Sequence, residues 1–145
     1  MLVKSRFLGE LHIDESRIII FEDGILGFED IKEYCIVPIP LKENFFLLQS
    51  VKDKNISFVL INPWDTFKAY DINIEDNYLK SMDIKDTSQL AVYSIISFKK
   101  NDVTANLLAP VVINAETKKG TQIVLHSSKY KTKHSIYTTM HEEEC

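Results

Sequence analysis

The sequence predicts an all-β fold, an antiparallel β-barrel-like single domain with one or two short helices. Its 145 residues are a usual length for one domain, and 45% of them are hydrophobic, which is enough to build a core without disulfides or metals. The apolar runs are short, rich in β-branched and aromatic residues, and separated by polar turns. Many short strands joined by tight turns favour a closed or nearly closed antiparallel barrel, or a sandwich.

Nine segments are expected to be strands because each combines β-forming residues with flanking turn residues. They are Lys4–Ile13, Ser16–Glu22, Glu33–Val37, Phe45–Ser50, Ser57–Ile61, Leu90–Phe98, Val103–Asn106, Pro110–Asn114 and Thr121–His126. In the first, Leu11 and Ile13 share one face, and Glu10 and His12 share the other. This alternation predicts a strand with one buried face and one solvated face.

Glycines mark two of the expected turns. Lys118-Lys119-Gly120 separates two strands and predicts a hairpin in which the glycine supplies a positive φ. Gly24-x-x-Gly27 lacks the lysine and the long helix of a phosphate-binding loop, and instead predicts a sharp corner after Phe21. Helical patterns are confined to residues 28–34 and 74–80, each too short to be stable without tertiary packing.

The chain is expected to be one domain over residues 1–138, followed by an acidic frayed tail at residues 139–145. Charges near the N-terminus interrupt any signal-peptide pattern, and the longest apolar run, Leu107–Ile113, is too short to cross a bilayer. We therefore expect a cytoplasmic protein without a membrane partner. Cys35 lies in an apolar stretch and is expected to be buried and inert, and Cys145 to be exposed, so two free thiols are favoured over a disulfide.

No residue pattern indicates catalysis or a cofactor. The four histidines are not paired with each other or with a cysteine at metal-ligand spacing, and the Gly-x-Ser-x-Gly motif of serine hydrolases is absent. Adjacent carboxylates such as Asp14-Glu15 point to opposite faces of a strand, so they do not form an acid–base pair. The sequence predicts a protein that is not an enzyme and needs no metal or cofactor.

Charge is distributed unevenly along the chain. Residues 1–98 carry 10 basic and 16 acidic side chains, whereas residues 99–134 carry seven lysines and two carboxylates. The net charge of −4 and the acidic N-terminal part disfavour phosphate contacts and favour a basic protein partner. Direct RNA binding by a small barrel stays an alternative, because Tyr130–His134 mixes aromatic and basic residues.

Several segments together resemble the FliW family of bacterial flagellar assembly factors. The most specific are the Gly24–Asp30 corner and the Thr104–Asn114 stretch; Phe7–Phe21, Phe46–Ser50, Gly120–Leu125 and Tyr130–His134 complete the series. The resemblance covers roughly Val3 to Tyr137. One departure is Leu26, where the family usually has proline.

The resemblance implies a role in partner switching. FliW-like proteins bind flagellin, and in many bacteria they also bind CsrA, a translational repressor of flagellin mRNA. Flagellin in excess then takes up the FliW-like protein and releases the repressor, a competition by mass action. The antagonism of CsrA is understood as allosteric rather than as mimicry of RNA. The protein is expected to act as a monomer that does not bind nucleic acid directly.

Two groups of residues are predicted to contact a protein partner. Phe28, Glu29 and Asp30 project from the glycine corner. Phe67, Tyr70 and Asp71 lie in an irregular aromatic and acidic stretch. Aromatic anchors with acidic neighbours suit a basic partner. By contrast, Asn106 and Asn114 are expected to hydrogen-bond the backbone at a bend or strand end.

Overall fold

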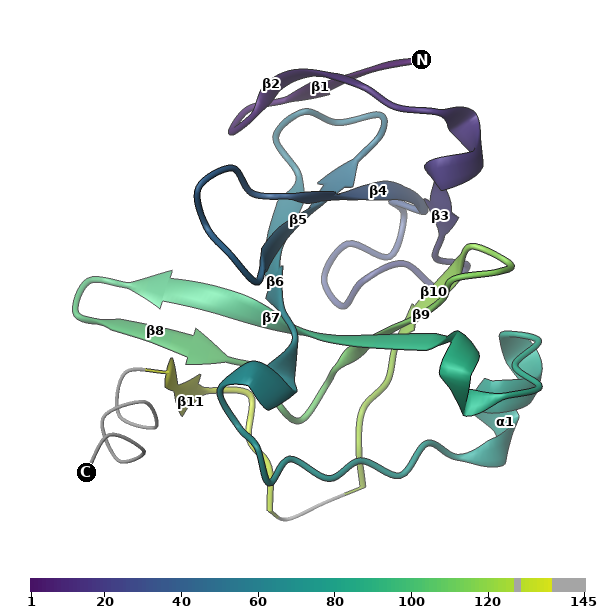
Figure 1. Cartoon of the computed structure of the whole chain (residues 1–145), viewed down its shortest axis with the longest axis vertical. Helices are drawn as coiled ribbons and strands as arrows, with labels where there is room; N and C mark the ends of the chain where they lie inside the picture. Colours follow the sequence, from purple (N-terminus) through teal and green to yellow (C-terminus); the bar gives the residue numbers. More distant parts are fainter. Residues whose placement is uncertain (127–128, 137–145) are drawn as a thin grey trace.

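The computed structural model describes residues 1–126 and 129–136, and it confirms a mostly β, barrel-like single domain (Figure 1). The strands are β1 (Leu2–Ser5), β2 (Gly9–His12), β3 (Ile19–Ile20), β4 (Glu33–Pro38), β5 (Phe45–Ser50), β6 (Ser57–Ile61), β7 (Leu90–Lys99), β8 (Asp102–Ala105), β9 (Val111–Asn114), β10 (Lys119–Gln122) and β11 (His134–Ser135). The helix α1 spans Asp76–Ser81, and 3-10 turns span Glu15–Arg17, Pro63–Asp65 and Thr87–Gln89. The predicted acidic tail lies outside the described residues.

Nine of these strands form one sheet that curls back on itself. Their order is β11-β8-β7-β6-β5-β4-β3-β10-β9, and β7 pairs in addition with β9. The sheet is therefore barrel-like without being a closed barrel (Figure 1). The pairings are antiparallel except β3–β10, which is parallel and has a single registered pair, Ile20 with Lys119. β1 and β2 form a separate hairpin.

The long strand β7 organises the curled sheet because it has three neighbours. Its first four residues, Leu90–Tyr93, pair with β9. Farther along, Ser94–Ile96 pair with β6 and Ile96–Lys99 pair with β8. β6 therefore pairs with only a short middle part of β7, whereas β9 and β8 pair with its two ends.

The core is divided into three clusters of buried side chains. β4 and β5 place Tyr34 and Leu48 in one cluster, together with Phe21 from the chain that follows β3. The opposite faces of β4 and β5 place Cys35 and Leu47 against the N-terminal hairpin. A third cluster lies around the 62–84 segment, β8 and β9. Strands covered on both faces explain why the apolar runs of β4 and β5 are nearly continuous.

The structure corrects the predicted first strand. The single strand Lys4–Ile13 is wrong, because Gly9 adopts a φ of +76° and the chain reverses between β1 and β2. The hydroxyl of Ser5 accepts a hydrogen bond from the backbone N–H of Leu8 at 3.1 Å and stabilises this turn. The predicted alternation holds within β2, where Leu11 packs inward.

The β9–β10 hairpin is confirmed, but its geometry differs from the prediction. Lys118, not Gly120, supplies the positive φ, at +60°. Gly120 is required for a different reason: a Cβ there would lie 2.5 Å from the ring of Phe21. β10 ends at Gln122 rather than at the predicted position 126, although the backbone N–H of Ile123 still donates to Pro110. The short strand β11 was not predicted.

Candidate protein-binding surface

The corner after β3 carries three of the predicted contact residues, and its sharp geometry is confirmed. Gly24 and Gly27 have φ values of +67° and +89°. A Cβ on Gly24 would lie 2.6 Å from the Cα of Glu29. The backbone N–H of Phe28 donates to the carbonyl of Ile25 at 2.7 Å, which folds the corner back on itself. Position 24 therefore accommodates only glycine.

The side chains predicted to project from this corner all reach the surface. Phe28 is 37% exposed, and its ring meets Phe58 edge-on at a centroid distance of 5.3 Å. The carboxylate of Glu29 accepts a hydrogen bond from the backbone N–H of Gly27 at 3.0 Å, and this bond lowers the pKa of Glu29. Asp30 is exposed. The corner presents an anchored aromatic ring beside two carboxyl groups.

The structure corrects one member of the second predicted group, Tyr70. Its side chain is only 5% exposed, and its hydroxyl donates to the carbonyl of Leu107 at 2.7 Å. The ring of Tyr130 packs edge-on against it at 4.7 Å. Burial raises the pKa of Tyr70 well above its ordinary value. Tyr70 is a core residue in this structure, so a partner would not contact its side chain directly.

The other two members of that group remain accessible. Asp71 is exposed, and its backbone N–H donates to the hydroxyl of Tyr130 at 2.8 Å. Phe67 is partly buried, with the ring of His134 edge-on at 6.0 Å. Phe67 packs against a different core cluster from the one that anchors Phe28 through Phe58. The two predicted groups of contact residues therefore do not pack against the same core cluster.

A groove of about 890 Å³ lies between the 62–79 segment and the first half of β7. Its apolar lining comprises Phe46, Trp64, Ile72, Ile74, Leu79 and residues 90–93. Its polar lining side chains are Asn44, Asn62, Asp65, Asn73, Asp76 and Thr87. The groove thus combines aromatic and aliphatic surface with polar groups, as binding sites usually do.

Aromatic side chains shape both walls of the groove. Phe46 and Tyr93 meet edge-on at 5.6 Å on the sheet side. On the other side, the indole N–H of Trp64 donates to the carbonyl of Tyr70 at 2.7 Å, which fixes the orientation of the indole. The buried Tyr70 therefore helps to hold Trp64 in its place in the groove wall.

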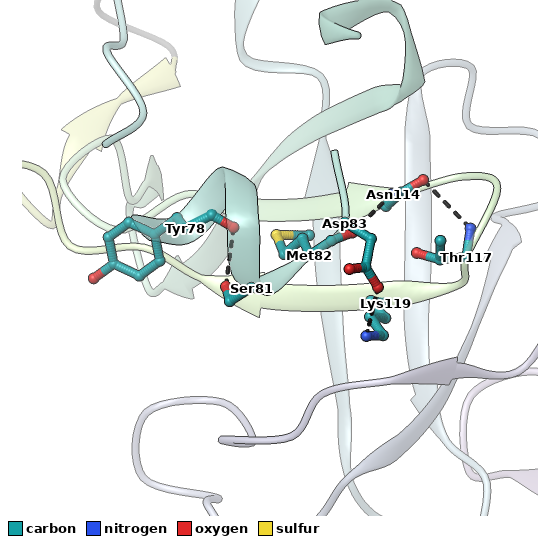
Figure 2. A network of polar contacts seen from close by, with 7 residues as sticks. All are labelled: Tyr78, Ser81, Met82, Asp83, Asn114, Thr117 and Lys119. Carbon is teal, nitrogen blue, oxygen red and sulfur yellow. Dashed lines mark hydrogen bonds and ion pairs between the residues drawn. The ribbon is translucent and has the colours of Figure 1, made fainter. Parts of the chain in front are cut away.

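The end of the groove formed by α1 is tied to the β9–β10 hairpin. Figure 2 shows Asn114, which is fully buried, with its side-chain amide donating to the carbonyl of Met82 at 2.8 Å. Its amide oxygen accepts from the backbone N–H of Thr117 at 3.3 Å. Beside it, Lys119 and Asp83 form an ion pair at 2.9 Å. These contacts confirm the structural role predicted for Asn114, and they hold α1 in place.

The electrostatic character of the groove is acidic. Among the described residues that line it, Asp65 and Asp76 are charged and none is a lysine or an arginine. Among the residues that the structure describes, no group of three or more His, Cys, Asp or Glu side chains is placed to hold a metal ion. In the same part of the chain, no helix is long and apolar enough to cross a membrane. Cys35 is buried, which raises the pKa of its thiol.

Sequence reasoning missed the groove because its lining comes from four separate segments. Phe46, Trp64 and Tyr93 lie far apart in the sequence, and only the fold brings them together. One signal was present: the irregular stretch after Pro63 contains the only tryptophan of the chain. A large aromatic residue in a segment without regular periodicity is typical of a binding surface.

The fold and this groove define a class: a single-domain, barrel-like β protein with an acidic and aromatic groove beside one strand. The profile of the family described as FliW protein matches residues 2–136. A protein of Alkaliphilus metalliredigens named flagellar assembly factor FliW is 42% identical over 139 residues, covering 94% of this chain and 86% of the relative. A protein of the same name from Bacillus velezensis is 37% identical over 138 residues, covering 94% and 96%.

A solved structure gives the same result. The crystal structure of a flagellar assembly factor FliW superposes with a TM-score of 0.88 at 36% sequence identity, covering 94% of this chain and 96% of that one. The chain belongs to the FliW family.

Proposed function

We propose that this protein is a non-catalytic flagellar assembly factor that binds flagellin and antagonises CsrA by partner switching. Family membership over residues 2–136 is the observation that carries the proposal. Relatives covering nearly the whole chain are named flagellar assembly factors. The protein would act in the cytoplasm as a monomer, without direct contact to nucleic acid or membrane.

The charge distribution supports a basic partner. Residues 1–98 have a net excess of six acidic side chains, and the groove has acidic lining residues. Opposite charges accelerate encounter and disfavour wrong partners. Two partners that bind competitively divide the protein according to their free concentrations and dissociation constants. Such competition needs no catalytic group.

The accessible residues of the two predicted groups are the proposed contacts. Phe28, Glu29 and Asp30 form one candidate surface, and Phe67 with Asp71 forms another. A partly exposed ring held by a core neighbour loses little entropy on binding, which suits a hot spot. The buried side chain of Tyr70 is not one of these contacts.

Calorimetry with purified flagellin and CsrA from the same bacterium tests the proposal. The wild-type protein is expected to bind each partner, and saturating flagellin is expected to displace CsrA. Phe28→Ala and Asp71→Lys should each weaken binding to at least one partner by about tenfold, since hot-spot truncations cost about 1–2 kcal/mol. Glu10→Lys, an exposed change on β2, is the matched control and should bind as the wild type does.

If the wild-type protein does not bind flagellin, or does not bind CsrA, the proposed function is wrong. If both partners bind but Phe28→Ala and Asp71→Lys leave both affinities unchanged, these two surfaces are not the contacts.

A second candidate function is direct RNA binding, and one local feature favours it. Lys99 lies next to Lys133, and a hydrogen bond between the two side chains, together with their charge repulsion, lowers the pKa of Lys133. Lys100 and Lys131 are also exposed in the two segments that carry this pair. Tight binding of labelled flagellin leader RNA, weakening steeply with salt and lost in Lys99→Ala/Lys133→Ala, would support this function. The absence of salt-dependent binding would exclude it.

A further inference from the structure

The groove runs along the edge of β7 rather than over one face of the sheet. Side chains of a strand alternate between the two faces, so a cavity on one face is lined by every second residue. Here four consecutive residues, Leu90 to Tyr93, line the groove. Val92 packs with one core cluster, while Ala91 packs with another. A cavity that contacts residues from both faces lies beside the backbone.

The register of β7 with β9 shows which backbone groups face this cavity. The carbonyl of Gln89 accepts a hydrogen bond from the backbone N–H of Ala115 at 3.0 Å. In an antiparallel ladder the hydrogen-bonded pairs alternate, so Ala91 and Tyr93 also bond toward β9. Val92 therefore directs both its N–H and its carbonyl to the opposite side.

The position next to Val92 on that side is not filled by another strand in the described part of the chain. β6 pairs with β7 only as far as Ile61, which lies opposite Ser94. Beyond it, Pro63 begins a 3-10 turn that Asn62 caps by accepting the backbone N–H of Trp64 at 3.0 Å. The 3-10 turn stays close to β7, but strand pairing ends here, so no strand of the described chain continues the line of β6 beside Val92.

One backbone group on this edge of β7 already has a hydrogen-bond partner within the fold. The N–H of Leu90 donates to the carbonyl of Thr87, but its carbonyl points the same way as the backbone of Val92. An added segment therefore finds two carbonyls and one N–H on residues 90 and 92. These groups are next to the aromatic pair Phe46 and Tyr93, which can cover the added chain.

We propose that this groove binds an extended peptide segment of the protein partner, which adds as a strand beside Leu90–Tyr93 in the line that β6 vacates. Backbone hydrogen bonds to Val92 hold the segment, and apolar side chains at alternate positions enter the groove. At least one lysine or arginine of the segment faces Asp65 or Asp76, the charged residues of the lining. This inference rests on the proposed function, because it supplies the mode by which a flagellar partner is bound.

Residue-resolved hydrogen exchange on the wild-type protein tests the proposal without any substitution. In the free protein the amide of Val92 should exchange fast, while those of Ala91 and Tyr93 are protected by β9. Saturation with full-length flagellin should slow exchange at Val92 by at least tenfold and leave its two neighbours nearly unchanged. Continued fast exchange at Val92 in the complex would overturn the inference.

A matched pair of variants separates the backbone from the side chain. Val92→Ala keeps the N–H and loses only side-chain contacts, whereas Val92→Pro also removes the N–H and should weaken flagellin binding at least tenfold more than Val92→Ala does. Circular dichroism checks that each variant is folded; if Val92→Pro is not, the exchange experiment decides. Equal affinity of two folded variants would contradict strand addition.

Charge reversal tests the predicted basic residue of the segment. Asp65→Lys/Asp76→Lys should weaken flagellin binding at least tenfold at low salt, and the loss should shrink as salt is raised. Glu10→Lys is again the control. Wild-type protein that binds no flagellin would overturn the proposed function; wild-type binding with an unprotected Val92 amide would overturn strand addition alone.

Discussion

Replacing Asn114 by alanine should be among the more destabilising single changes in this protein. The side chain is fully buried, and its amide donates at 2.8 Å to the carbonyl of Met82. Its oxygen accepts from the backbone N–H groups of Glu116 at 3.0 Å and Thr117 at 3.3 Å. Alanine leaves the carbonyl of Met82 without this donor, at a cost of about 1–3 kcal/mol, and removes two turn bonds worth about 0.5–1 kcal/mol each.

The expected loss in the free energy of unfolding is therefore about 2–5 kcal/mol, or about 5–20 °C in Tm for a domain of this size. Urea denaturation of Asn114→Ala measures it directly. Asn77→Ala, an exposed change of the same type on α1, is the control and should stay within about 0.5 kcal/mol of the wild type. A loss under about 1 kcal/mol in Asn114→Ala, with the amides of α1 still protected from exchange, would refute the assigned anchoring role.

Three further outcomes follow from the described geometry. Gly24→Ala should lower the free energy of unfolding by about 2–4 kcal/mol, because a Cβ at this positive φ would also clash with the backbone. Gly9→Ala, at a positive φ but in open space, should lower it by only about 1 kcal/mol. Equal losses in denaturation experiments would contradict the clash at position 24. The carboxyl of Glu29 should titrate below its ordinary pKa of 4.5 in an NMR titration. Its contribution to stability is therefore present above pH 4.5 and is lost as the pH falls through the lowered pKa. A pKa at or above 4.5 would show that the hydrogen bond from the N–H of Gly27 is absent in solution. The thiol of Cys35 should resist labelling by a thiol reagent until the protein unfolds, because it is buried and its pKa is raised; rapid labelling in the native state would show that it is accessible.

Local sequence patterns predicted the strands of the central meander accurately. The bounds of β5 and β6, Phe45–Ser50 and Ser57–Ile61, match the prediction because turn residues flank each apolar run on both sides. The corner at Gly24 was also predictable, since closely spaced glycines in a chain with only four indicate a specific backbone requirement. These features depend on neighbours in the sequence.

Features that depend on distant contacts were not predictable. The hairpin of β1 and β2 was read as one strand, because the residues between Ser5 and Gly9 remain compatible with an extended chain. Tyr70 was placed at the surface, because its acidic and basic neighbours hide that its hydroxyl reaches Leu107 across the fold. Similarly, the groove depends on the side of β7 that β6 leaves open, and one sequence without the sheet register does not reveal this.

The β3–β10 pairing also bears on how the chain folds. Ile20 and Lys119 are separated by most of the described chain, and their strands share only this one registered pair. The pairings from β4 through β8 join consecutive segments, whereas this one closes a loop of roughly 100 residues, at an entropic cost about 2 kcal/mol above that of a loop of about ten residues. We expect the consecutive hairpins to form first and this long-range pairing last. Substitutions that weaken the contact between Gly120 and Phe21 should then accelerate unfolding while leaving the folding rate nearly unchanged.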